Sequence, residues 1–499
     1  MKKYKVRKTL TKSGSTAVQV VCYRNRKLEF VRQIGSGKTE EEIVTLVKRA
    51  EYWIESNEPQ QELFIPPKQV EVKNLEVIGV YQSTSYKTLL DTARRCGLSS
   101  KKEKFLIDFA IIRIIEPASK LRSITLLSQY FGIEYSERTV YRKIKELHLL
   151  KKSIEQKALE CAKEQLDQDL SLILYDVTTL YFETFKSDEL RVPGFSKDNK
   201  HQQPQIVVGL IVTRSGFPLS YEVFSGNTFE GKTMLEVLKN FIKINSVARP
   251  VVVADAAMLS HQNIQELVKE GYSYIVGARL GNMTWKMIDK ISSKIKPTDG
   301  KIIREKTKEG DLIVQFSQKR YNKDKHEFEK QLERAKESIE KSASAKNVKF
   351  VKPKNKNNEY ILNNELIEKA RKLLGLKGYY TNIQKSELSN PEIIERYHDL
   401  WQIEKSFRIT KSDLATRPVF HHNSRSVKSH ILICFTALMM SKYLELATGY
   451  SIRRITDAIK EIKEVVMQDS VTGLTISKFS RPHHNTEPIM ELLKGKVSY

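Results

Sequence analysis

The spacing of apolar and polar residues divides the chain into a short α+β segment, a helical segment and a β-rich segment. Ala17–Arg24 and Leu28–Ile34 alternate as the two strands of a hairpin, and a helix is predicted to begin at Thr39–Glu42, which has capping-box spacing. Residues 1–60 are therefore predicted to form a small basic module, a candidate for DNA binding. Asn57–Lys68 contains three prolines and is predicted to be a linker.

Helical periodicity dominates residues 70–168, which we predict to form a helical domain. Its most apolar run, Phe105–Ile115, ends near Pro117. After Gly132, the basic stretch Ser136–Leu147 has a capping serine and fits the second helix of a helix-turn-helix pair. Such a helix is a candidate for DNA contact, although a basic face is also common on solvated helices.

Strand patterns dominate the next segment, residues 169–280. The first strand is predicted to break off at Asp176, and the apolar strand Val251–Ala254 is predicted to end at Asp255. Three strands in a meander, followed by helix, strand, helix and strand, is the order of a ribonuclease-H-like core, in which acids at strand ends meet on one rim. We therefore predict an α/β catalytic core that starts in this segment.

The predicted core is interrupted by a polar, lysine-rich segment at residues 281–376. A hairpin around Glu309–Gly310 and a long charged helix over Asp324–Ser342 are expected in it, so it is predicted to be a β-containing insertion outside the core. The core is predicted to resume over residues 377–470, and residues 471–499 are predicted to be a basic C-terminal tail.

A helix is predicted from Ser389, where the residues Ser-Asn-Pro-Glu form a capping box, to about Lys411. A glutamate falls in the middle of its otherwise apolar face, and a buried carboxylate needs a partner such as a metal ion. The residues predicted to share this face are Ile393, Tyr397, Leu400, Glu404, Phe407 and Lys411.

The net charge of +25 favours a polyanionic partner such as DNA. The four cysteines form no C-x-x-C pair, so neither a zinc site nor a disulfide framework is expected, and the reducing cytoplasm, with association to the nucleoid, is the expected location. The apolar run Ile431–Met440 is too short to span a bilayer. It is predicted to be a core helix, and no membrane partner is expected.

Three acids stand in matching contexts: Asp176 and Asp255 at predicted strand ends, and Glu404 on the predicted helix. An isolated acid after a strand is more often a capping or ion-pairing residue. Three of them in a strongly basic chain instead predict a site for two divalent cations that act on a phosphodiester. Ligation by oxygen alone favours Mg²⁺.

The spacing of Tyr397, Glu404 and Lys411 matches a known signature: Tyr, two residues, Arg, three residues, Glu, six residues, Lys. It belongs to DDE transposases of insertion sequences, and the chain resembles their insertion-sequence-four superfamily. Leu400 occupies the arginine position of the signature, so that role would fall to His398, to Arg408 or to no residue. Further matching pieces are Tyr175–Thr179, Gly194–Asp198, Gly226–Thr228 and Arg417–His421.

The resemblance implies cut-and-paste DNA transposition, in which water attacks the phosphodiester at an element end and the freed 3′-hydroxyl then attacks target DNA. It implies that Asp176, Asp255 and Glu404 hold two Mg²⁺ ions, with Mn²⁺ able to substitute. It also implies double-stranded DNA as the partner, at element ends and target, and a homodimer or larger assembly on DNA. The DNA-contacting residues that follow from it are Tyr397 and Lys411, then Arg408 and Thr178.

Two other functions remain open from the sequence. Gly226–Thr233 fits the phosphate-binding pattern G-x-x-x-x-G-K-T, and Val251–Asp255 could be the magnesium-binding strand of a nucleotide triphosphatase acting on DNA. Against this, Leu219–Phe224 alternates like a half-exposed antiparallel strand, whereas a P-loop follows a buried parallel one. The other alternative is a DNA-binding protein that keeps the fold without catalysis.

Overall fold

The chain forms two compact units, which are described separately. The first comprises Met1–Lys87, Leu126–Glu134 and Asp457–Glu491, and the second comprises Thr88–Thr125, Tyr135–Thr456 and Leu492–Tyr499. The computed structural model describes residues 4–24, 27–57, 72–184, 186–194, 202–245, 250–256, 260–295, 297–340, 348–354, 359–417, 419 and 423–496. The predicted linker and parts of the motif segments Gly194–Asp198 and Arg417–His421 lie outside these residues.

The N-terminal module of the first unit is a three-stranded antiparallel sheet covered by one helix. Val18 and Val20 pack with Ala50 at its centre. The predicted hairpin and helix are confirmed, and the capping box is present, because the Glu42 N–H donates to the Thr39 hydroxyl at 3.3 Å. The first strand was not predicted. The elements are β1 (Tyr4–Leu10), β2 (Thr16–Arg24), β3 (Lys27–Gly37) and α1 (Glu40–Asn57).

A second sheet of the first unit joins distant parts of the sequence. Its strands are antiparallel in the order β16-β15-β4. Helical structure therefore begins later than the predicted residue 70, and part of the segment predicted as a tail is a strand. Val77 and Phe479 on this sheet are exposed. The strands are β4 (Leu75–Tyr81), β15 (Glu464–Asp469) and β16 (Thr475–Phe479).

The predicted helical segment does consist of helices beyond β4. They are α2 (Ser83–Arg95), α3 (Lys104–Ile115), α4 (Lys120–Phe131), α5 (Glu137–Leu147) and α6 (Lys151–Glu160). In α5, the Ser136 hydroxyl accepts from the Thr139 N–H, which confirms the predicted cap. The buried residues of α5, among them Val140 and Ile144, lie on the side that packs against α14 (Ser424–Thr448), and basic residues such as Arg142 are exposed.

Helix α14 contains the predicted core helix Ile431–Met440. Among the described residues it is the one helix with the length and hydropathy of a membrane span, but 83% of its most apolar window is buried inside the protein. Helices α3 and α5 and strand β7 pack against it. Its burial against these elements agrees with the predicted role as a core helix.

The main sheet of the second unit has the strand order predicted for a ribonuclease-H-like core. Strands β5, β6 and β7 form an antiparallel meander, and β8 and β9 follow on the other side of β5 in parallel. Helices α7 (Glu230–Asn245) and α8 (His261–Lys269) connect these strands. The strands are β5 (Leu172–Tyr181), β6 (Gln205–Thr213), β7 (Pro218–Ser225), β8 (Val251–Ala254) and β9 (Tyr274–Ala278).

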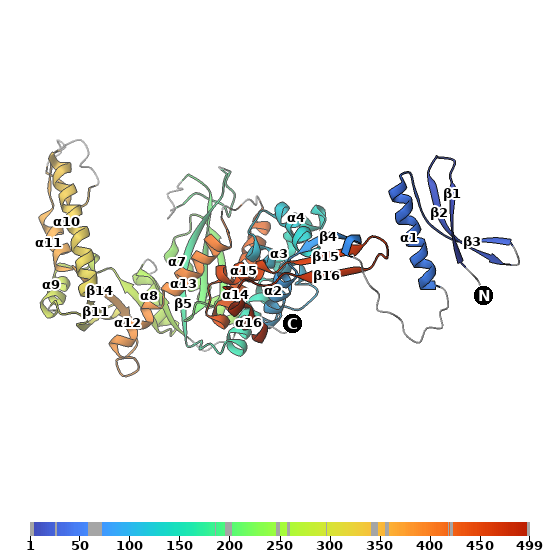
Figure 1. Ribbon diagram of the computed structural model, residues 1–499. Coiled ribbons are helices and arrows are strands. Elements are labelled where there is room, and N and C mark those ends of the chain that lie inside the picture. The colour runs from blue at the N-terminus through green and yellow to red at the C-terminus, as the bar shows by residue number, and fades with distance from the viewer. Residues whose placement is uncertain are drawn as a thin grey trace. The chain divides into compact units, whose positions relative to one another are not determined.

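Part of the predicted insertion belongs to this sheet. Strands β10 (Ile302–Thr307) and β11 (Gly310–Phe316) form the predicted hairpin, and they pair through β14 (Leu376–Thr381) with β9. The sheet therefore has eight strands in the order β10-β11-β14-β9-β8-β5-β6-β7. The rest of the segment lies beyond this end of the sheet (Figure 1) and has its own small core around Phe328 and Phe350. Its elements are α9 (Trp285–Lys294), α10 (Gln318–Glu340), β12 (Val351–Pro353), β13 (Tyr360–Leu362) and α11 (Asn364–Lys372).

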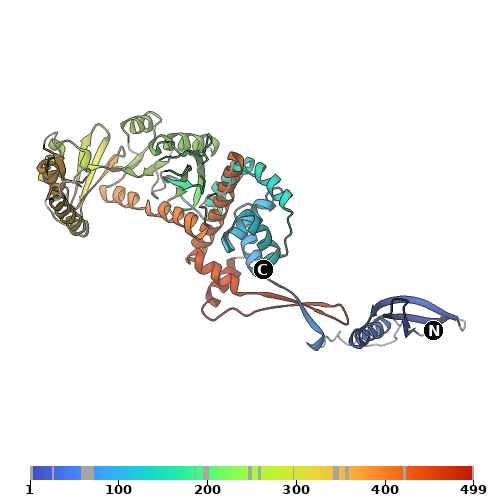
Figure 2. The same ribbon diagram turned by 90° about the horizontal axis from the view of Figure 1, so that it is seen from above.

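The single helix predicted from Ser389 to Lys411 is two helices, α12 (Asn390–His398) and α13 (Trp401–Arg408), followed by a wide turn. At their junction Arg214 donates to Asp399 at 2.6 Å and to Glu395 at 2.9 Å, which ties the end of α12 to the turn after β6. In Figure 2 the orange helices run alongside the green strands of the main sheet, in agreement with the packing of α12 on β8 and β9 and of α13 on β5 and β6.

Replacing Ser389 by alanine should destabilise the start of α12. The Ser389 side chain accepts from the Glu392 N–H, and Glu392 accepts from the Ser389 N–H at 2.8 Å, so the substitution removes half of a reciprocal cap. We expect a loss of about 1 kcal/mol of unfolding free energy. Urea unfolding measures it, with Ser386→Ala, an exposed serine three residues earlier, as the control. Equal stability of both variants would contradict the predicted contribution of the cap.

Candidate active site

Asp176 does not end its strand, contrary to the prediction. Strand β5 continues to Tyr181, and Asp176 pairs with Leu210 of β6. The parallel pairing with β8, however, ends one residue earlier, at Tyr175 and Ala254. Asp176 is therefore the first residue of β5 beyond the parallel ladder, and its side chain is half-buried.

Asp255 directly follows β8, as predicted, and is exposed. Because Tyr175 pairs with Ala254, the next residue on each strand is an aspartate, and Asp176 and Asp255 stand side by side at one edge of the parallel ladder. The Asp255 Oδ1 accepts from the Tyr397 hydroxyl of α12 at 3.1 Å. A hydrogen bond thus joins the second predicted acid to the helix pair that carries the third.

Glu404 lies on α13, which packs against β5 and β6. It is exposed, so the expectation that a carboxylate would be buried in the apolar face was wrong. The predicted face is otherwise kept across the break between α12 and α13, and its apolar members are buried while the carboxylate is open to solvent. The neighbours that do pack inward are Ile393, Tyr397, Leu400 and Phe407.

The charges of Asp255 and Glu404 influence the pKa values of Lys377 of β14, which is lowered overall, and of Tyr397, which is raised. Burial and the nearby Arg320 lower the pKa of Lys377, whereas Asp255 and Glu404 raise it. Burial raises the pKa of the Tyr397 hydroxyl, and the charge of Asp255, its hydrogen bond and the charge of Glu404 raise it further. The two carboxylates therefore share one neighbourhood, with the Lys377 ammonium 4.7 Å from the centroid of the Tyr397 ring.

Gly277 of β9 makes the bond between Tyr397 and Asp255 sterically feasible. A Cβ atom at this position would lie 2.5 Å from the Tyr397 hydroxyl oxygen and 3.1 Å from the Cβ of Ala256. Any larger residue would thus have to displace the tyrosine. No sequence pattern pointed to Gly277, whereas Lys377, the one charged residue of strand β14, was a signal that could have been noticed.

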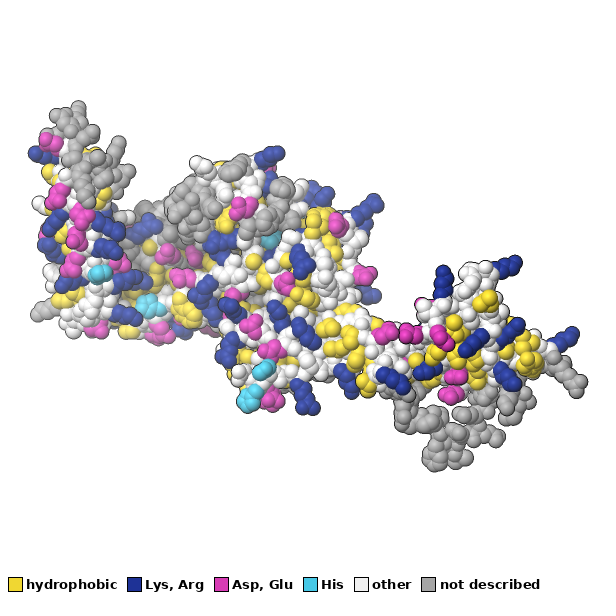
Figure 3. Space-filling model, turned by 45° about the horizontal axis from the view of Figure 1, so that its top comes forward, with side chains coloured by type: hydrophobic (Ala, Val, Ile, Leu, Met, Phe, Trp, Pro, Cys, Tyr) yellow, Lys and Arg dark blue, Asp and Glu magenta, His cyan; other side chains and the backbone are white. Residues whose placement is uncertain are grey.

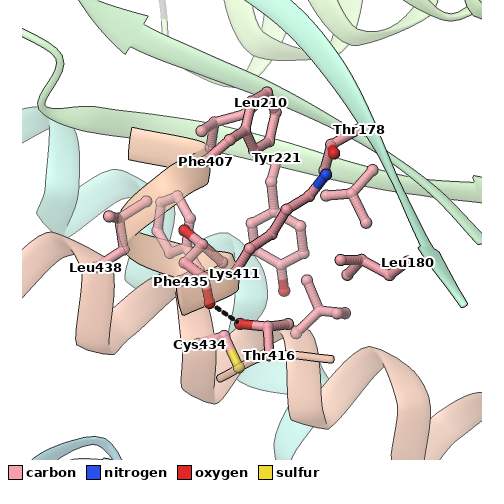
Figure 4. A pocket seen from close by; sticks show the side chains of 13 residues that line it. Thr178, Leu180, Leu210, Tyr221, Phe407, Lys411, Thr416, Cys434, Phe435 and Leu438 are labelled. Carbon is pink, nitrogen blue, oxygen red and sulfur yellow. Dashed lines mark hydrogen bonds between the residues drawn. The ribbon is translucent and has the colours of Figure 1, made fainter. Parts of the chain in front are cut away.

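The residues predicted to contact DNA differ in accessibility. Arg408 is exposed, whereas Tyr397 and Thr178 are only 6% and 5% exposed. Lys411 extends into an apolar pocket beside Phe407 and Phe435, with its terminal nitrogen toward Thr178 (Figure 4). Direct DNA contact by these residues stays a prediction, and only Arg408 offers its charge to solvent without rearrangement.

Leu400, which occupies the arginine position of the signature, and the nearby His398 differ in exposure. Leu400 is 8% exposed and packs inward at the junction of α12 and α13. His398 is exposed, and its Nε2 lies 3.3 Å from the Tyr379 hydroxyl. The position that holds arginine in the signature therefore faces the core of this protein.

The strand before the G-x-x-x-x-G-K-T segment is β7, which pairs antiparallel with β6 at the edge of the sheet. A P-loop instead follows a buried parallel strand. The Thr233 side chain, which would reach the magnesium ion of a nucleotide, is fully buried and lies 2.7 Å from the Tyr175 hydroxyl. The structure therefore does not favour the nucleotide triphosphatase.

A family model described as the transposase DDE domain matches residues 167–440, more than half of the 499 residues. The chain belongs to the DDE transposase family. It is accordingly an enzyme of DNA transposition, which cuts and rejoins phosphodiester bonds, and enzymes of this family generally use divalent metal ions. The matched range contains all three predicted acids.

Solved structures of transposases show only slight likeness to this one. A piggyBac transposase synaptic complex with hairpin DNA matches at 8% identity and a TM-score of 0.40, covering 84% of this chain and 82% of its own. A Mos1 transposase paired-end complex with the left transposon end matches at 12% identity and a TM-score of 0.16, covering 46% and 66%. At these TM-scores neither likeness establishes a shared fold or activity. No curated protein matches the chain.

The donor atoms of the candidate site suit a divalent cation, because carboxylate oxygens are hard ligands of the kind that such ions bind. Among the described residues, no group of three or more His, Cys, Asp or Glu side chains is arranged to hold a metal ion. Asp255 and Glu404 are exposed side chains on different elements, so both are open to an ion from solvent. The residues thus fit a metal in chemistry and location, while the coordination itself is not preformed.

Replacing Tyr397 by phenylalanine in the transposase should slow DNA cutting roughly tenfold, because Asp255 loses a hydrogen bond that fixes its carboxylate. Single-turnover nicking of an element-end duplex measures the rate. Tyr379→Phe is the matched control, since its ring packs 4.8 Å from that of Tyr397 while its hydroxyl faces His398. If both variants slowed cutting equally, the bond to Asp255 would not be the cause.

Proposed function

We propose that Asp176, Asp255 and Glu404 bind two Mg²⁺ ions, with Mn²⁺ able to substitute, in the DNA-cutting site. The observation that carries the proposal is the register of β5 and β8, which sets the two aspartates side by side. When bound, such ions activate the attacking oxygen and stabilise the leaving oxygen. Tyr397 orients Asp255 through its hydrogen bond. Lys377 adds a positive charge to the same neighbourhood.

The proposed reaction is cut-and-paste transposition in the manner of the insertion-sequence-four superfamily. The transposase would hydrolyse the phosphodiester at the end of its element and join the freed 3′-hydroxyl to target DNA. Pairing two ends requires a homodimer or larger assembly on double-stranded DNA, and we place it on the nucleoid in the cytoplasm. Arg408 is the most accessible of the proposed phosphate contacts, with Tyr397, Lys411 and Thr178 nearer the interior.

Element-end binding by the N-terminal module forms part of the proposal. On the face seen in Figure 3, Lys and Arg side chains are interleaved with Asp and Glu, so the net charge alone does not locate a DNA-binding surface. The composition of the sheet face turned away from α1 indicates a DNA-binding surface more directly than the net charge does. Strand register puts exposed Lys5 and Arg7 of β1 on this face, together with Gln19, Tyr23 and Phe30. Cations, an amide and exposed aromatic rings suit contact with phosphates and bases.

Replacing Asp176 or Asp255 by asparagine, or Glu404 by glutamine, should reduce metal-dependent nicking of element-end DNA on the order of hundredfold or more, because each removes a charged ligand. Glu387→Gln is the matched control, as an exposed acid in the turn before α12 that lies outside the junction held by Arg214. Gel shifts without metal should show unchanged DNA binding. Full nicking activity of the Asp176 variant would overturn the site, and a wild-type protein that binds its own ends without nicking them would indicate a binding protein.

Replacing Arg7 by glutamine should weaken binding of the full chain to element-end duplexes and lower the slope of log affinity against log salt by about 0.9, the value for one lost phosphate contact. Lys48→Gln, an exposed lysine on α1, is the control on the other side of the module. Affinities are measured by fluorescence anisotropy over a range of salt concentrations. An unchanged slope for the Arg7 variant would show that this sheet face does not contact the DNA backbone.

A further inference from the structure

The second unit contains another pocket besides the one that Lys411 enters, and it opens directly beside Asp255. It has a volume of about 400 Å³, and Asp255 and Tyr397 form the side that adjoins the proposed active site. The remaining walls come from the end of β9 and the residues after it, from the start of β14 and from the first turns of α10. We name it the β9–β14 pocket, and three cations line it: Arg279, Arg320 and Lys377.

The charges of the β9–β14 pocket do not cancel internally. Its acidic lining residues are Asp255 and Asp324. Asp324 is engaged within the wall, because it pairs with Arg320 at 3.2 Å and accepts from the Gly375 N–H at 3.2 Å. Asp255 belongs to the proposed metal site. The pocket therefore keeps positive charge, with Arg279 exposed and Lys377 half-buried.

The Lys377 ammonium is positioned by two aromatic rings. It lies 4.7 Å from the ring centroid of Tyr397 and 5.6 Å from that of Tyr379. Ring faces stabilise the charge without satisfying all three N–H donors of an ammonium group, so donors remain for an anion. Lys377 of β14, Arg320 of α10 and Arg279 after β9 thus line one open pocket that ends at Asp255.

We propose that Arg279, Arg320 and Lys377 bind one backbone phosphate of the DNA strand next to the bond being cut, and so position that strand against Asp255. A phosphate offers two free oxygens, which match the N–H groups of a guanidinium fork and an ammonium. These are positioning residues for the reaction. The inference rests on the proposed function, since the partner is the DNA that the transposase cuts.

The test combines charge-removing variants with DNA that lacks single phosphate charges. Element-end duplexes carry one neutral methylphosphonate at each position around the cleavage site in turn, and binding without metal and single-turnover nicking are both measured. At one of these positions, the neutral linkage should weaken binding by the wild-type protein about tenfold or more and slow its nicking. The Arg279→Gln and Lys377→Gln variants should bind native DNA more weakly than the wild type does. The neutral linkage at that position should reduce their affinity little further, because the contact with the phosphate is already gone.

Lys319→Gln is the matched control, since Lys319 is exposed on α10 beside Arg320 but does not line the pocket, and it should keep the wild-type pattern. Lys377→Arg should restore sensitivity at the same position, which separates lost charge from misfolding. Full sensitivity in the Arg279 and Lys377 variants would overturn the inference. The binding measurements test phosphate contact by the pocket even if the wild type does not nick DNA. A failure of the proposed function and a failure of the proposed phosphate contact are therefore distinguishable.

Discussion

The proposed active site depends on the register between the central strand β5 and its parallel neighbour β8. Leu172, Ile173 and Leu174 are fully or almost fully buried, so the position of β5 is fixed by packing on both of its faces. A shift of β8 by one residue would turn every side chain of that strand to the other face. Burial of these apolar residues therefore sets the placement of Asp255 beside Asp176, although neither aspartate contributes to the core.

The third acid is placed by a different kind of constraint. Glu404 reaches the site on α13, whose start is set by the break after α12, and Arg214 holds that break through Glu395 and Asp399. The Tyr397 hydroxyl then links α12 to Asp255, which is sterically allowed because residue 277 is a glycine. Polar contacts between elements thus position Glu404, whereas strand packing positions the aspartates.

This difference explains what the sequence could and could not predict. Strand β6 is buried along its whole length and belongs to the meander that the sequence predicted, as local patterns suffice for such elements. Strand β4 was missed although its sequence is largely apolar, because it lies outside the core and its pairing partner, β15, comes from a distant part of the chain. The three acids were predicted from residue type and spacing, and their role as metal ligands stays a prediction. The exposure of Glu404 and the approach of Lys377 arise from contacts between distant segments, which no local pattern encodes.

The insertion is joined to the main sheet at one end. Its hairpin extends the main sheet through β14, and the Ser317 N–H donates to the Gly375 carbonyl at 3.0 Å where β11 ends. Helix α10 begins at the next residue, so the position of Arg320 in its first turn is fixed by the sheet. Farther along, α10 packs instead in the separate cluster around Phe328 and Phe350. The first turn of α10 is therefore tied to the sheet that carries the two aspartates, whereas the rest of the helix packs within the insertion.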